Sequence, residues 1–456
     1  MQRSRSKAAK VAARAISRSL AYQSLYQEKN ISLAEITRSR DPLDLLPILT
    51  KEDIFERFSL QEMVASDVPM QNLAGVLTSS GHGGTNFAFG VSTRRDKGRA
   101  PFDIDLGLEQ AFQIDTRSTL LVNCLPMGVV FESDTVCVAN VSVREDMACA
   151  ILQQAGPHFD QCILVLDPLF AKRLLDYARL IKMDWSVLHS SVILGEETFS
   201  EEFRSYLSKE IGALAVHDGQ MRIGSSMGVG ELGLNLFFEC AETIAIRRAL
   251  HHQDPDATAP TFFCYNPLRS LVEIVDVDET GYGDLVVTML DEHAPIPMIR
   301  YRTGDKVRLL TDTDLRFLSS VERDAVASLP LPVIAHRGKT TAAQTAKTWS
   351  ADQCKSLLYR DQSIADSFSG AFVLRKEEGI HCWEVQRSPF SEAPTETLTE
   401  PLQALTDETA TRIGLEPLRV TVWPYQDFKW GMGLDHERKF RYVPKPAQHQ
   451  AAKIVT

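Results

Sequence analysis

The sequence predicts an α/β protein with a large N-terminal domain and a small α+β C-terminal domain. Three observations lead to this prediction. Short apolar runs alternate with helical patterns between residues 120 and 194, strand patterns with turn residues follow after about residue 264, and a separate strand and helix pattern lies beyond residue 335. The 456 residues exceed the roughly 100–200 that one domain commonly needs. We therefore expect domains at 1–335 and 336–456.

The first half of the chain has the pattern of a parallel sheet. Leu120–Cys124, Cys162–Leu166 and Ser191–Leu194 are apolar runs of strand length. Leu169–Ile181 lies between two of them and repeats its apolar residues at helical spacing. Alternation of strands and helices is typical of parallel strands covered by helices. Ligands bind beyond the carboxyl ends of such strands, and Gly195 follows the third run at that place.

The later segments predict antiparallel strands and then a small mixed domain. Leu271–Val277 and Leu285–Leu290 are strand-like, and the turn residues of 279–284 lie between them. The segment 335–339 marks the expected boundary. Beyond it the sequence predicts two strands, a helix and a third strand: Ala371–Leu374, His381–Val385, Glu396–Ile413 and Leu418–Trp423.

Charge composition bears on the partners. The formal net charge is −11, which argues against a nucleic-acid partner, because phosphate backbones attract clustered positive charge. The one basic cluster, 3–18, has the composition of a transit peptide or of a membrane-surface helix. We favour a helix that leads into the fold, with an apolar stripe at Ile16, Leu20, Leu25 and Tyr26. No run approaches the roughly 18 apolar residues of a membrane span, so we expect a cytoplasmic protein.

The cysteines do not indicate a disulfide framework. Eight are scattered along the chain, and several lie in apolar runs where they are expected to pack as small hydrophobes. By residue type, Cys240, His251, His252 and Cys264 are candidate zinc ligands. Their separations match no compact ligand pattern, so zinc is not expected.

A run of hydroxyl residues and glycines predicts a phosphate-binding loop. Such a backbone can wrap phosphate oxygens with N–H and O–H donors. The absence of a following Gly-Lys-Ser/Thr excludes a Walker-type loop. His82 lies inside the run and could donate to a phosphate oxygen. The expected contact residues are Ser79, Ser80, Gly81, His82, Gly83, Gly84 and Thr85.

A second run, Tyr301–Asp305, ends in a carboxylate that could accept both hydroxyls of a ribose. Together, the two runs resemble those of the adenylate-forming superfamily, and the phenylacetate-CoA ligase-like branch is the most similar. Four further segments support the resemblance in the expected order, the last of which ends with the second run. These are Leu46–Asp53, Gly195–Glu202, Ser226–Gly233 and Pro297–Asp305.

The resemblance implies roles for individual residues. Asp305 corresponds to the ribose ligand, Glu231 to the magnesium-associated glutamate, and Lys339 to the hinge. Lys439 corresponds to the catalytic lysine of a mobile C-terminal lid domain, with Lys429 and Lys445 as rivals. The remaining expected nucleotide contacts are Gly195, Met227, Gly228 and Arg337.

The chain also departs from the family pattern. The phosphate loop lacks the usual lysine, Met227 replaces an aromatic residue that stacks on adenine, and Gly230 replaces a hydroxyl residue. The acyl pocket is expected to involve Pro126, Met127 and Gly128 together with residues near Gly195 and Gly228. No substrate size follows from these residues.

The resemblance implies an ATP-dependent ligase. A carboxylic acid, aromatic or otherwise hydrophobic, would react with Mg²⁺-bound ATP to give an acyl-AMP and pyrophosphate, and the acyl group would pass to coenzyme A. Three alternatives stay open at this point. The acceptor could be an amine or a protein cysteine, the chain could bind nucleotide without catalysis, or it could have the same architecture and bind no ligand. A homodimer is compatible with all of them.

Overall fold

The computed structural model describes residues 2–39, 42–78, 88–126, 128–212, 216–217, 220–339, 348–377, 379–430 and 436–444. The chain forms two compact units, each assembled from three segments. Unit 1 consists of Met1–Asp167, Asp184–Thr198 and Ile211–Ala342, and unit 2 consists of Pro168–Met183, Phe199–Glu210 and Ala343–Thr456. Two helical segments of the first half are thus grouped with the C-terminal residues.

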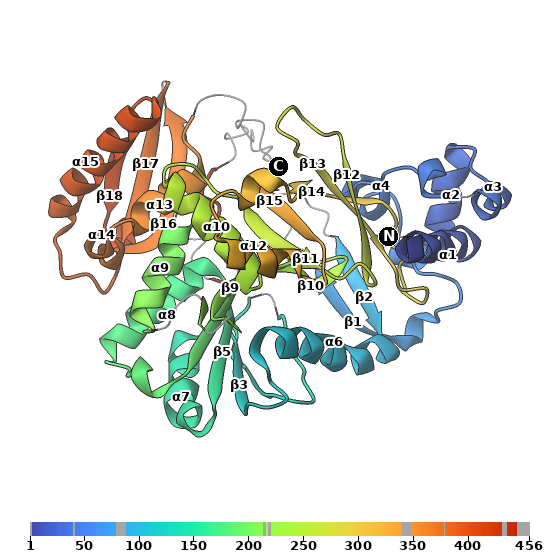
Figure 1. Ribbon diagram of the computed structural model, residues 1–456, viewed down its shortest axis with the longest axis horizontal. Helices are drawn as coiled ribbons and strands as arrows, with labels where there is room; N and C mark the ends of the chain where they lie inside the picture. Colours follow the sequence, from blue (N-terminus) through green and yellow to red (C-terminus); the bar gives the residue numbers. More distant parts are fainter. Residues whose placement is uncertain are drawn as a thin grey trace, which may run out of the picture. The chain divides into compact units, whose positions relative to one another are not determined.

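Unit 1 is built on an eleven-stranded mixed sheet with the strand order β12-β13-β14-β15-β11-β10-β9-β6-β5-β3-β4 (Figure 1). One end of the sheet is parallel, because β4, β3, β5, β6 and β9 run in the same direction. These strands are β3 (Thr119–Asn123), β4 (Cys137–Asn140), β5 (Gln161–Leu166), β6 (Ser190–Leu194) and β9 (Ile223–Val229).

The other end of this sheet is antiparallel. Successive strands pair from β9 to β10, β11, β15, β14, β13 and β12. These strands are β10 (Gly233–Phe238), β11 (Thr261–Tyr265), β12 (Ser270–Val275), β13 (Gly283–Met289), β14 (Tyr301–Leu309) and β15 (Val333–Lys339). β15 spans the boundary expected between residues 335 and 336.

Two short hairpins also belong to unit 1. β1 (Leu73–Thr78) pairs with β2 (Phe89–Thr93), and β7 (Val216–His217) pairs with β8 (Gln220–Met221). β2 leads into the long helix α6 (Arg94–Phe112), whose first turn is capped by Thr93: the backbone N–H of Asp96 donates to the Thr93 hydroxyl, and the Asp96 carboxylate accepts the Thr93 N–H. Such a capping box satisfies backbone donors that a helix start leaves free.

The remaining helices of unit 1 cover the sheet or precede it. They are α1 (Gln2–Arg18), α2 (Leu20–Glu28), α3 (Leu33–Arg38), α4 (Lys51–Phe55), α5 (Leu60–Met63), α7 (Glu145–Ala155), α10 (Ala241–Gln253), α11 (Asp312–Leu315) and α12 (Ser320–Ala327). Short 3₁₀ turns occur at Pro42–Leu45, Met70–Asn72, Gly156–His158 and Trp185–Val187. None of the described helices is long and apolar enough to cross a bilayer.

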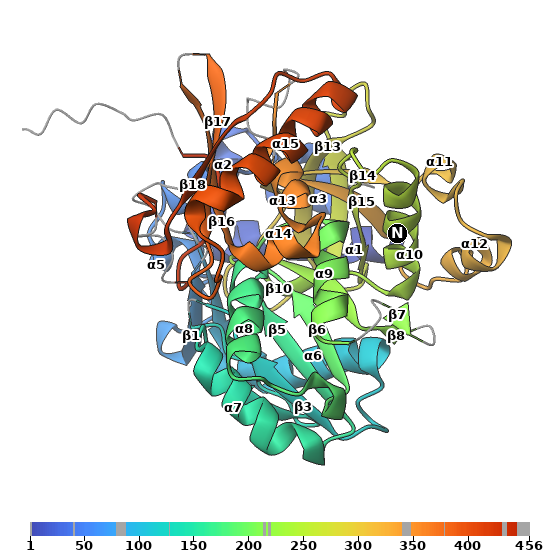
Figure 2. The same ribbon diagram turned by 90° about the vertical axis from the view of Figure 1, so that its left-hand side faces the viewer.

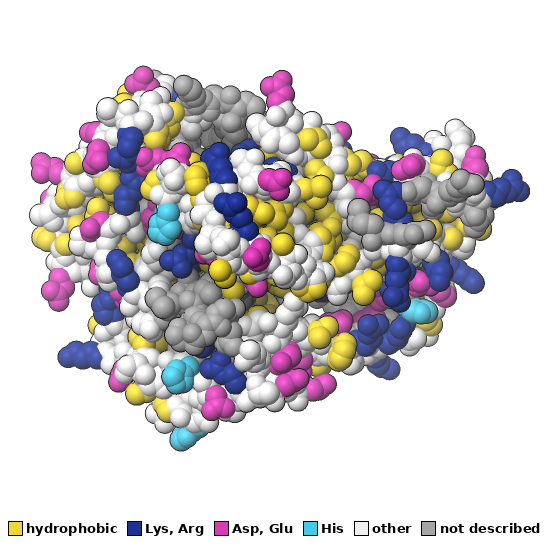
Figure 3. Space-filling model, viewed as in Figure 1, with side chains coloured by type: hydrophobic (Ala, Val, Ile, Leu, Met, Phe, Trp, Pro, Cys, Tyr) yellow, Lys and Arg dark blue, Asp and Glu magenta, His cyan; other side chains and the backbone are white. Residues whose placement is uncertain are grey.

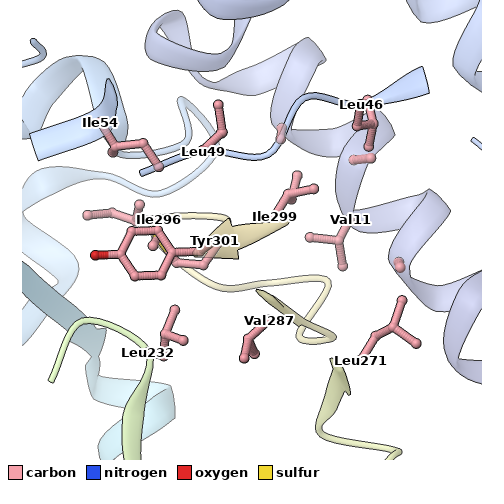
Figure 4. Close-up of a cluster of buried hydrophobic side chains, with 14 of the residues drawn as sticks. Val11, Leu46, Leu49, Ile54, Leu232, Leu271, Val287, Ile296, Ile299 and Tyr301 are labelled. Atoms are coloured by element: carbon pink, nitrogen blue, oxygen red, sulfur yellow. The ribbon is translucent and has the colours of Figure 1, made fainter. Parts of the chain in front are cut away.

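The N-terminal helices bury their apolar faces against strands that come more than 200 residues later. Val11 of α1, Leu271 of β12 and Val287 of β13 belong to one buried cluster, which Figure 4 shows in close-up. The hydroxyl of Tyr22 accepts the backbone N–H of Ile299 at 3.3 Å. The basic start of the chain is therefore a helix that packs into the core.

The apolar stripe that the sequence predicts for the first two helices is wrong at one position, Leu20. Leu20 is 58% exposed, whereas Tyr22 is fully buried. The reason is that α2 begins at Leu20 after the break at Ser19, so the helical phase of α1 does not continue into α2. Arg3 and Arg18 of α1 are exposed, and Lys and Arg side chains gather over this part of unit 1 in Figure 3.

Unit 2 combines a three-stranded sheet with helices. β17 (Ile380–Arg387) lies between β16 (Phe368–Glu377), which is antiparallel to it, and β18 (Arg419–Trp423), which is parallel. The crossover to the parallel strand is α15 (Thr395–Ile413), which lies along β18 in Figures 1 and 2. The other elements are α8 (Pro168–Leu180), α9 (Glu201–Glu210), α13 (Ala351–Tyr359), α14 (Gln362–Ser367) and the 3₁₀ turn Tyr425–Asp427.

A buried ion pair lies within α8, and one of its members is hydrogen-bonded to Ser388 of unit 2. The ammonium of Lys172 lies 2.6 Å from Asp176 one helical turn away, and both side chains are almost fully buried. Asp176 also accepts a hydrogen bond from the hydroxyl of Ser388 at 3.1 Å. Burial lowers the pKa of Lys172 and raises the pKa of Asp176, against the attraction between the two charges.

The predicted fold class is confirmed. The expected parallel strands, the antiparallel strands after residue 264 and the small α+β region are all present, within about three residues of the expected bounds at most ends. The sequence did not indicate that both strand types join into one continuous sheet.

Candidate functional site

Glu231 lies in the tight turn between β9 and β10. Its carboxylate accepts a short hydrogen bond from the hydroxyl of Tyr301 at the start of β14. Tyr301 is 2% exposed, and burial, together with the charge of Glu231, raises the pKa of its phenol. Tyr301 therefore stays protonated at neutral pH and acts as a donor that fixes the Glu231 carboxylate.

The predicted phosphate loop lies outside the described residues. All seven expected contacts, Ser79 to Thr85, fall in the segment 79–87. Its two flanking strands are described, because β1 ends at Thr78 and β2 begins at Phe89. The residues on either side of the predicted loop, Thr78 and Ala88, are therefore both described.

Gly90, near the start of β2, lies against the turn that carries Glu231. A Cβ at Gly90 of β2 would lie 2.9 Å from the carbonyl oxygen of Gly230 and 3.2 Å from that of Glu231. Real Cβ atoms almost never come so close to backbone, so only glycine fits here without a shift. The strand that follows the predicted phosphate loop is therefore in backbone contact with the turn that carries Glu231.

Asp305 is a buried carboxylate on β14, with a side chain that is 9% exposed. Its Oδ1 lies 3.2 Å from Nε2 of His336 on the neighbouring strand β15. Burial alone would raise the pKa of the Asp305 carboxyl, but the contact with His336 and the charge of Lys339 outweigh burial, so the pKa is lowered. Asp305 is therefore ionised at neutral pH and can only accept hydrogen bonds.

His336 is a site residue that the sequence interpretation missed. Its ring is 6% exposed and lies 5.6 Å from the ring of Phe263, measured between centroids. Its Nδ1 is buried and has no hydrogen-bond partner among the described residues. In the sequence, His336 directly precedes the expected contact residue Arg337. A single histidine on a strand does not indicate which side chain it will bond.

Lys339 pairs with Asp305 across the β14–β15 ladder, at an irregularity in the register. Its side chain is exposed and follows Gly338, which has a φ of +81°. The positive φ at the end of the last strand of unit 1 is a backbone conformation that glycine adopts without strain.

Arg337 is exposed and contacts the β12–β13 connection. Its guanidinium lies 3.8 Å from the centre of the Tyr282 ring, and Nη1 lies 3.5 Å from the hydroxyl of Thr280. A guanidinium over an aromatic face is a favourable cation–π arrangement. Arg337, on the same strand as His336, is thus held against the β12–β13 connection.

Gly195 follows the carboxyl end of β6, as expected. Its N–H donates to the carbonyl of Leu166 at 3.0 Å, and a Cβ here would be in ordinary contact with Leu125 and with the backbone of Ser226, at 3.7 Å each. Three residues later, the Thr198 methyl lies 3.7 Å from the Cβ position of Gly338. The Gly195 segment therefore adjoins both β9 and β15.

Met227 and Gly228 lie on β9 opposite β10. Met227 is half-buried against the large core cluster of unit 1. A Cβ at Gly228 would lie 2.9 Å from the carbonyl oxygen of Gly233 and 3.0 Å from Cα of Leu234. The two strands approach too closely here for any larger residue.

The expected acyl pocket is only partly described. Met127 lies outside the described residues, and Gly128 has a φ of +68° in the turn after β3. Asn123, at the end of β3, donates to the carbonyl of Val129 at 2.7 Å and to Asn140 Oδ1 at 2.8 Å. These hydrogen bonds fix the turn that leaves the strand.

Lys439 lies in unit 2 on a segment anchored by Tyr442. The carbonyl of Tyr442 accepts the N–H of Leu374 at 2.7 Å, and its ring lies 4.6 Å from that of Phe372. Lys439, three residues earlier, is half-buried. Its rival Lys429 has its ammonium 4.5 Å from the centre of the Trp423 ring, and Lys445 lies outside the described residues.

The described residues were also tested for metal ligation. They contain no group of three or more His, Cys, Asp or Glu side chains that could hold a metal. Mg²⁺ in nucleotide sites commonly uses one or two carboxylates and completes its shell with phosphate oxygens and water. A single half-buried carboxylate such as Glu231 fits that requirement. Cys240 and Cys264 do lie together, with their sulfurs 3.7 Å apart, although His251 and His252 do not complete a group with them.

Comparisons with known proteins concern the fold. No family model and no curated protein matches the chain. Among solved structures it is similar to 2-hydroxyisobutyryl-CoA ligase in the postadenylation state in complex with R3-HIB-AMP, with a TM-score of 0.66, 13% identity and coverage of 97% of this chain and 89% of that one. An open conformation of the same ligase in complex with 2-HIB-AMP and CoA gives a TM-score of 0.55 at 13% identity, covering 97% of this chain and 91% of that one. The chain therefore has the fold of an acyl-CoA ligase.

Proposed function

We propose that this protein belongs to the adenylate-forming superfamily, in its phenylacetate-CoA ligase-like branch. In this proposal it activates a carboxylic acid as an acyl-AMP and transfers the acyl group to a thiol, with coenzyme A as the acceptor. An aromatic or otherwise hydrophobic acid is the expected substrate. The shared fold and the ligands named for its structural neighbour, an acyl-AMP and CoA, agree with this reaction.

One observation carries the proposal. The strand that returns from residues 79–87 touches the Glu231 turn at Gly90, and Tyr301 of β14 donates to Glu231. Asp305 lies four residues further along β14. The stem of the predicted phosphate loop therefore contacts the turn of the predicted magnesium ligand, and the predicted ribose ligand lies on the strand whose first residue contacts Glu231. These contacts between segments at least 70 residues apart in sequence support a shared site.

The geometry supports a separate role for each residue of the candidate site. Asp305, ionised and held by His336, would accept the ribose hydroxyls, while Glu231 would hold Mg²⁺ against the phosphates. The metal, when bound, would neutralise charge on the phosphate oxygens. Met227 and Gly228 would line the adenine and acyl side, and Gly195 would border it from β6. Arg337 would reach the ribose or a phosphate from the edge of β15.

Unit 2 would supply the catalytic cation. Lys439 on the anchored segment before Tyr442 would stabilise the charge that develops as the acyl–phosphate bond forms. Lys339, at the end of β15 and next to Gly338 with its positive φ, is the proposed hinge. Hinge residues absorb backbone rotation when a lid domain moves.

The decisive experiment is acid-dependent exchange of labelled pyrophosphate into ATP, over a panel of aromatic and aliphatic acids. Lys439→Ala should lower the exchange rate by about 10²–10³-fold, the usual effect of removing a group that stabilises transition-state charge, and Asp305→Ala should weaken ATP binding. Lys429→Ala is the matched control. Loss of exchange in Lys429→Ala instead would reassign the catalytic lysine, and ATP-dependent thermal stabilisation without exchange for any acid would indicate a non-catalytic nucleotide-binding protein.

A second assay identifies the acceptor. Preformed acyl-AMP is added to the enzyme with coenzyme A, with a set of amines or with a protein thiol. The proposal expects rapid acyl transfer to coenzyme A. Transfer only to an amine or only to a protein thiol would keep the adenylation step and replace the acceptor. The altered phosphate loop and Met227 make this separation of the two half-reactions necessary.

A further inference from the structure

Two cysteines 24 residues apart in sequence meet in the middle of the unit 1 sheet. The sulfurs of Cys240 and Cys264 are 3.7 Å apart, which is van der Waals contact between sulfur atoms. Cys264 lies on β11, paired with Phe238 of β10. Cys240 follows Phe238 by two residues and is therefore the diagonal neighbour of Cys264 across the strand pair.

Both cysteines are held by backbone contacts, so their proximity does not depend on a loop. Cys240 is the N-cap of α10, where its N–H donates to the hydroxyl of Thr243 at 2.9 Å and its carbonyl accepts the N–H of Ile244 at 3.0 Å. Cys264 pairs on its other side with Val333 of β15. The two residues are therefore held by different elements, Cys240 by the start of α10 and Cys264 by β11.

The pair is asymmetric in access to solvent. Cys264 is 1% exposed, whereas Cys240 is half-buried. The hydrogen bond with Cys240 and burial raise the pKa of the Cys264 thiol, so this sulfur keeps its proton. Of the six other cysteines, only Cys137 is exposed and the remaining five are buried. An oxidant from solvent therefore reaches Cys240 and finds a second sulfur directly behind it.

We propose that Cys240 and Cys264 form a reversible, oxidation-sensitive disulfide pair. Cys240 attacks hydrogen peroxide, the O–O bond breaks, and a sulfenic acid and one water result. The sulfur of Cys264 then attacks the sulfenyl sulfur, and the departing hydroxyl takes up the Cys264 proton and leaves as the second water. Two thiols and one peroxide thus give one disulfide and two waters, and a thiol reductant reverses the bond.

The cross-link would act on the part of the sheet that carries the candidate site. Bond formation shortens the distance between the sulfurs from 3.7 Å to about 2.05 Å. β11 pairs directly with β15, where Thr261 is opposite His336, and β10 begins just after the Glu231 turn. The bond would tie the end of β10 and the start of α10 to the strand beside His336. The proposal rests on the cysteine geometry and not on the proposed function.

The test is peptide mapping of the full chain. The protein is treated with stoichiometric hydrogen peroxide, free thiols are alkylated under denaturing conditions, and the digest is analysed by mass spectrometry. We expect a linked Cys240–Cys264 peptide, about 2 Da lighter than the two thiol peptides because two hydrogens are lost, which disappears after reduction. Alkylated Cys240 and Cys264 alongside oxidised Cys137 would overturn the proposal, as would Cys240 in the sulfinic state without a cross-link.

Variants test the order of the two steps. In Cys264→Ala, Cys240 should stop at a sulfenic acid that reacts with dimedone, and in Cys240→Ala the Cys264 peptide should remain a thiol. Cys137→Ser is the control, since Cys137 is exposed on β4, and it should form the linked peptide as the wild type does. Dimedone labelling of Cys264 in Cys240→Ala would contradict the assigned order. The wild-type mapping remains decisive if a cavity variant does not fold.

Discussion

The hydroxyl of Tyr301 donates to the carboxylate of Glu231 and joins the start of β14 to the turn between β9 and β10. Tyr301 is also packed against Phe55, with 6.4 Å between the ring centroids. The ring is thus held by the core, while the hydroxyl orients a carboxylate of the candidate site. Figure 4 shows the oxygen of Tyr301 directed away from the apolar side chains around the ring.

Tyr301→Phe should impair pyrophosphate exchange more than stability. The substitution keeps the buried ring and removes one hydrogen bond to a charged group, which is worth about 1.5–3 kcal/mol. We expect kcat/KM for exchange to fall by about tenfold or more, since each 1.36 kcal/mol changes a rate about tenfold. Tyr265→Phe, at another buried tyrosine of the same sheet, serves as the control. Equal losses of exchange in both variants would show that the Tyr301 hydroxyl has no special role.

Asp305→Asn should make the stability of the protein less dependent on pH in the acidic range. The folded pKa of Asp305 is lowered relative to its ordinary value, so its ionised form stabilises the fold above the unfolded pKa of about 3.9. That contribution is lost as the pH falls through the lowered folded pKa. We expect the wild type to lose more stability than Asp305→Asn between about pH 5 and pH 2, measured as Tm against pH. Parallel profiles for the two proteins would contradict this expectation.

Gly90→Ala should destabilise the chain, whereas Gly98→Ala should not. The added methyl at Gly90 would meet the backbone of Gly230 and Glu231, whereas a methyl at Gly98 in α6 would meet nothing within 4 Å. Forcing a methyl into packed backbone costs about 1–3 kcal/mol, and alanine in a helix is about 0.5–1 kcal/mol more favourable than glycine. Urea denaturation of both variants measures the difference. A neutral Gly90→Ala would mean that β2 and the Glu231 turn separate easily.

Lys172→Met should destabilise unit 2 strongly. It would leave the Asp176 carboxylate buried without its partner, since the lysine is fully buried and only 2.6 Å away. Breaking such a pair commonly costs about 3–5 kcal/mol, whereas replacing both members with apolar residues is often neutral. We expect the double variant Lys172→Met, Asp176→Leu to recover most of the loss in denaturant unfolding. A double variant as unstable as the single one would show that Ser388 and its neighbours require the charged group.

The fold could be predicted to a large extent because its elements carry local signals. Cys162–Leu166 is an uninterrupted apolar run, as expected of a strand buried on both faces, and it became β5. Glu396–Ile413 has the helical pattern of α15, which starts one residue earlier. The grouping of α8 and α9 with the C-terminal residues could not be predicted, because it depends on contacts between segments that are far apart in sequence.

The candidate site was predictable where a motif fixes the local backbone, and less so where partners come from different strands. The motifs single out Asp305 and Glu231 as candidates, but they do not indicate the hydrogen-bond partners that the structure shows, His336 and Tyr301. Nothing in a sequence of alternating strand residues tells which histidine will face which carboxylate. The register of β14 against β15, with its irregularity after Asp305, decides this, and it is set by the whole sheet.

The packing of α1 and α2 onto β12 to β14 has a consequence for biosynthesis. These helices are made before the strands that cover their apolar faces, because β12 begins only at residue 270. At translation rates of about 5–20 residues per second, the helices wait for roughly 15–60 seconds before their partners emerge. During that interval the nascent chain exposes an apolar stripe and several arginines, and we expect it to bind a chaperone.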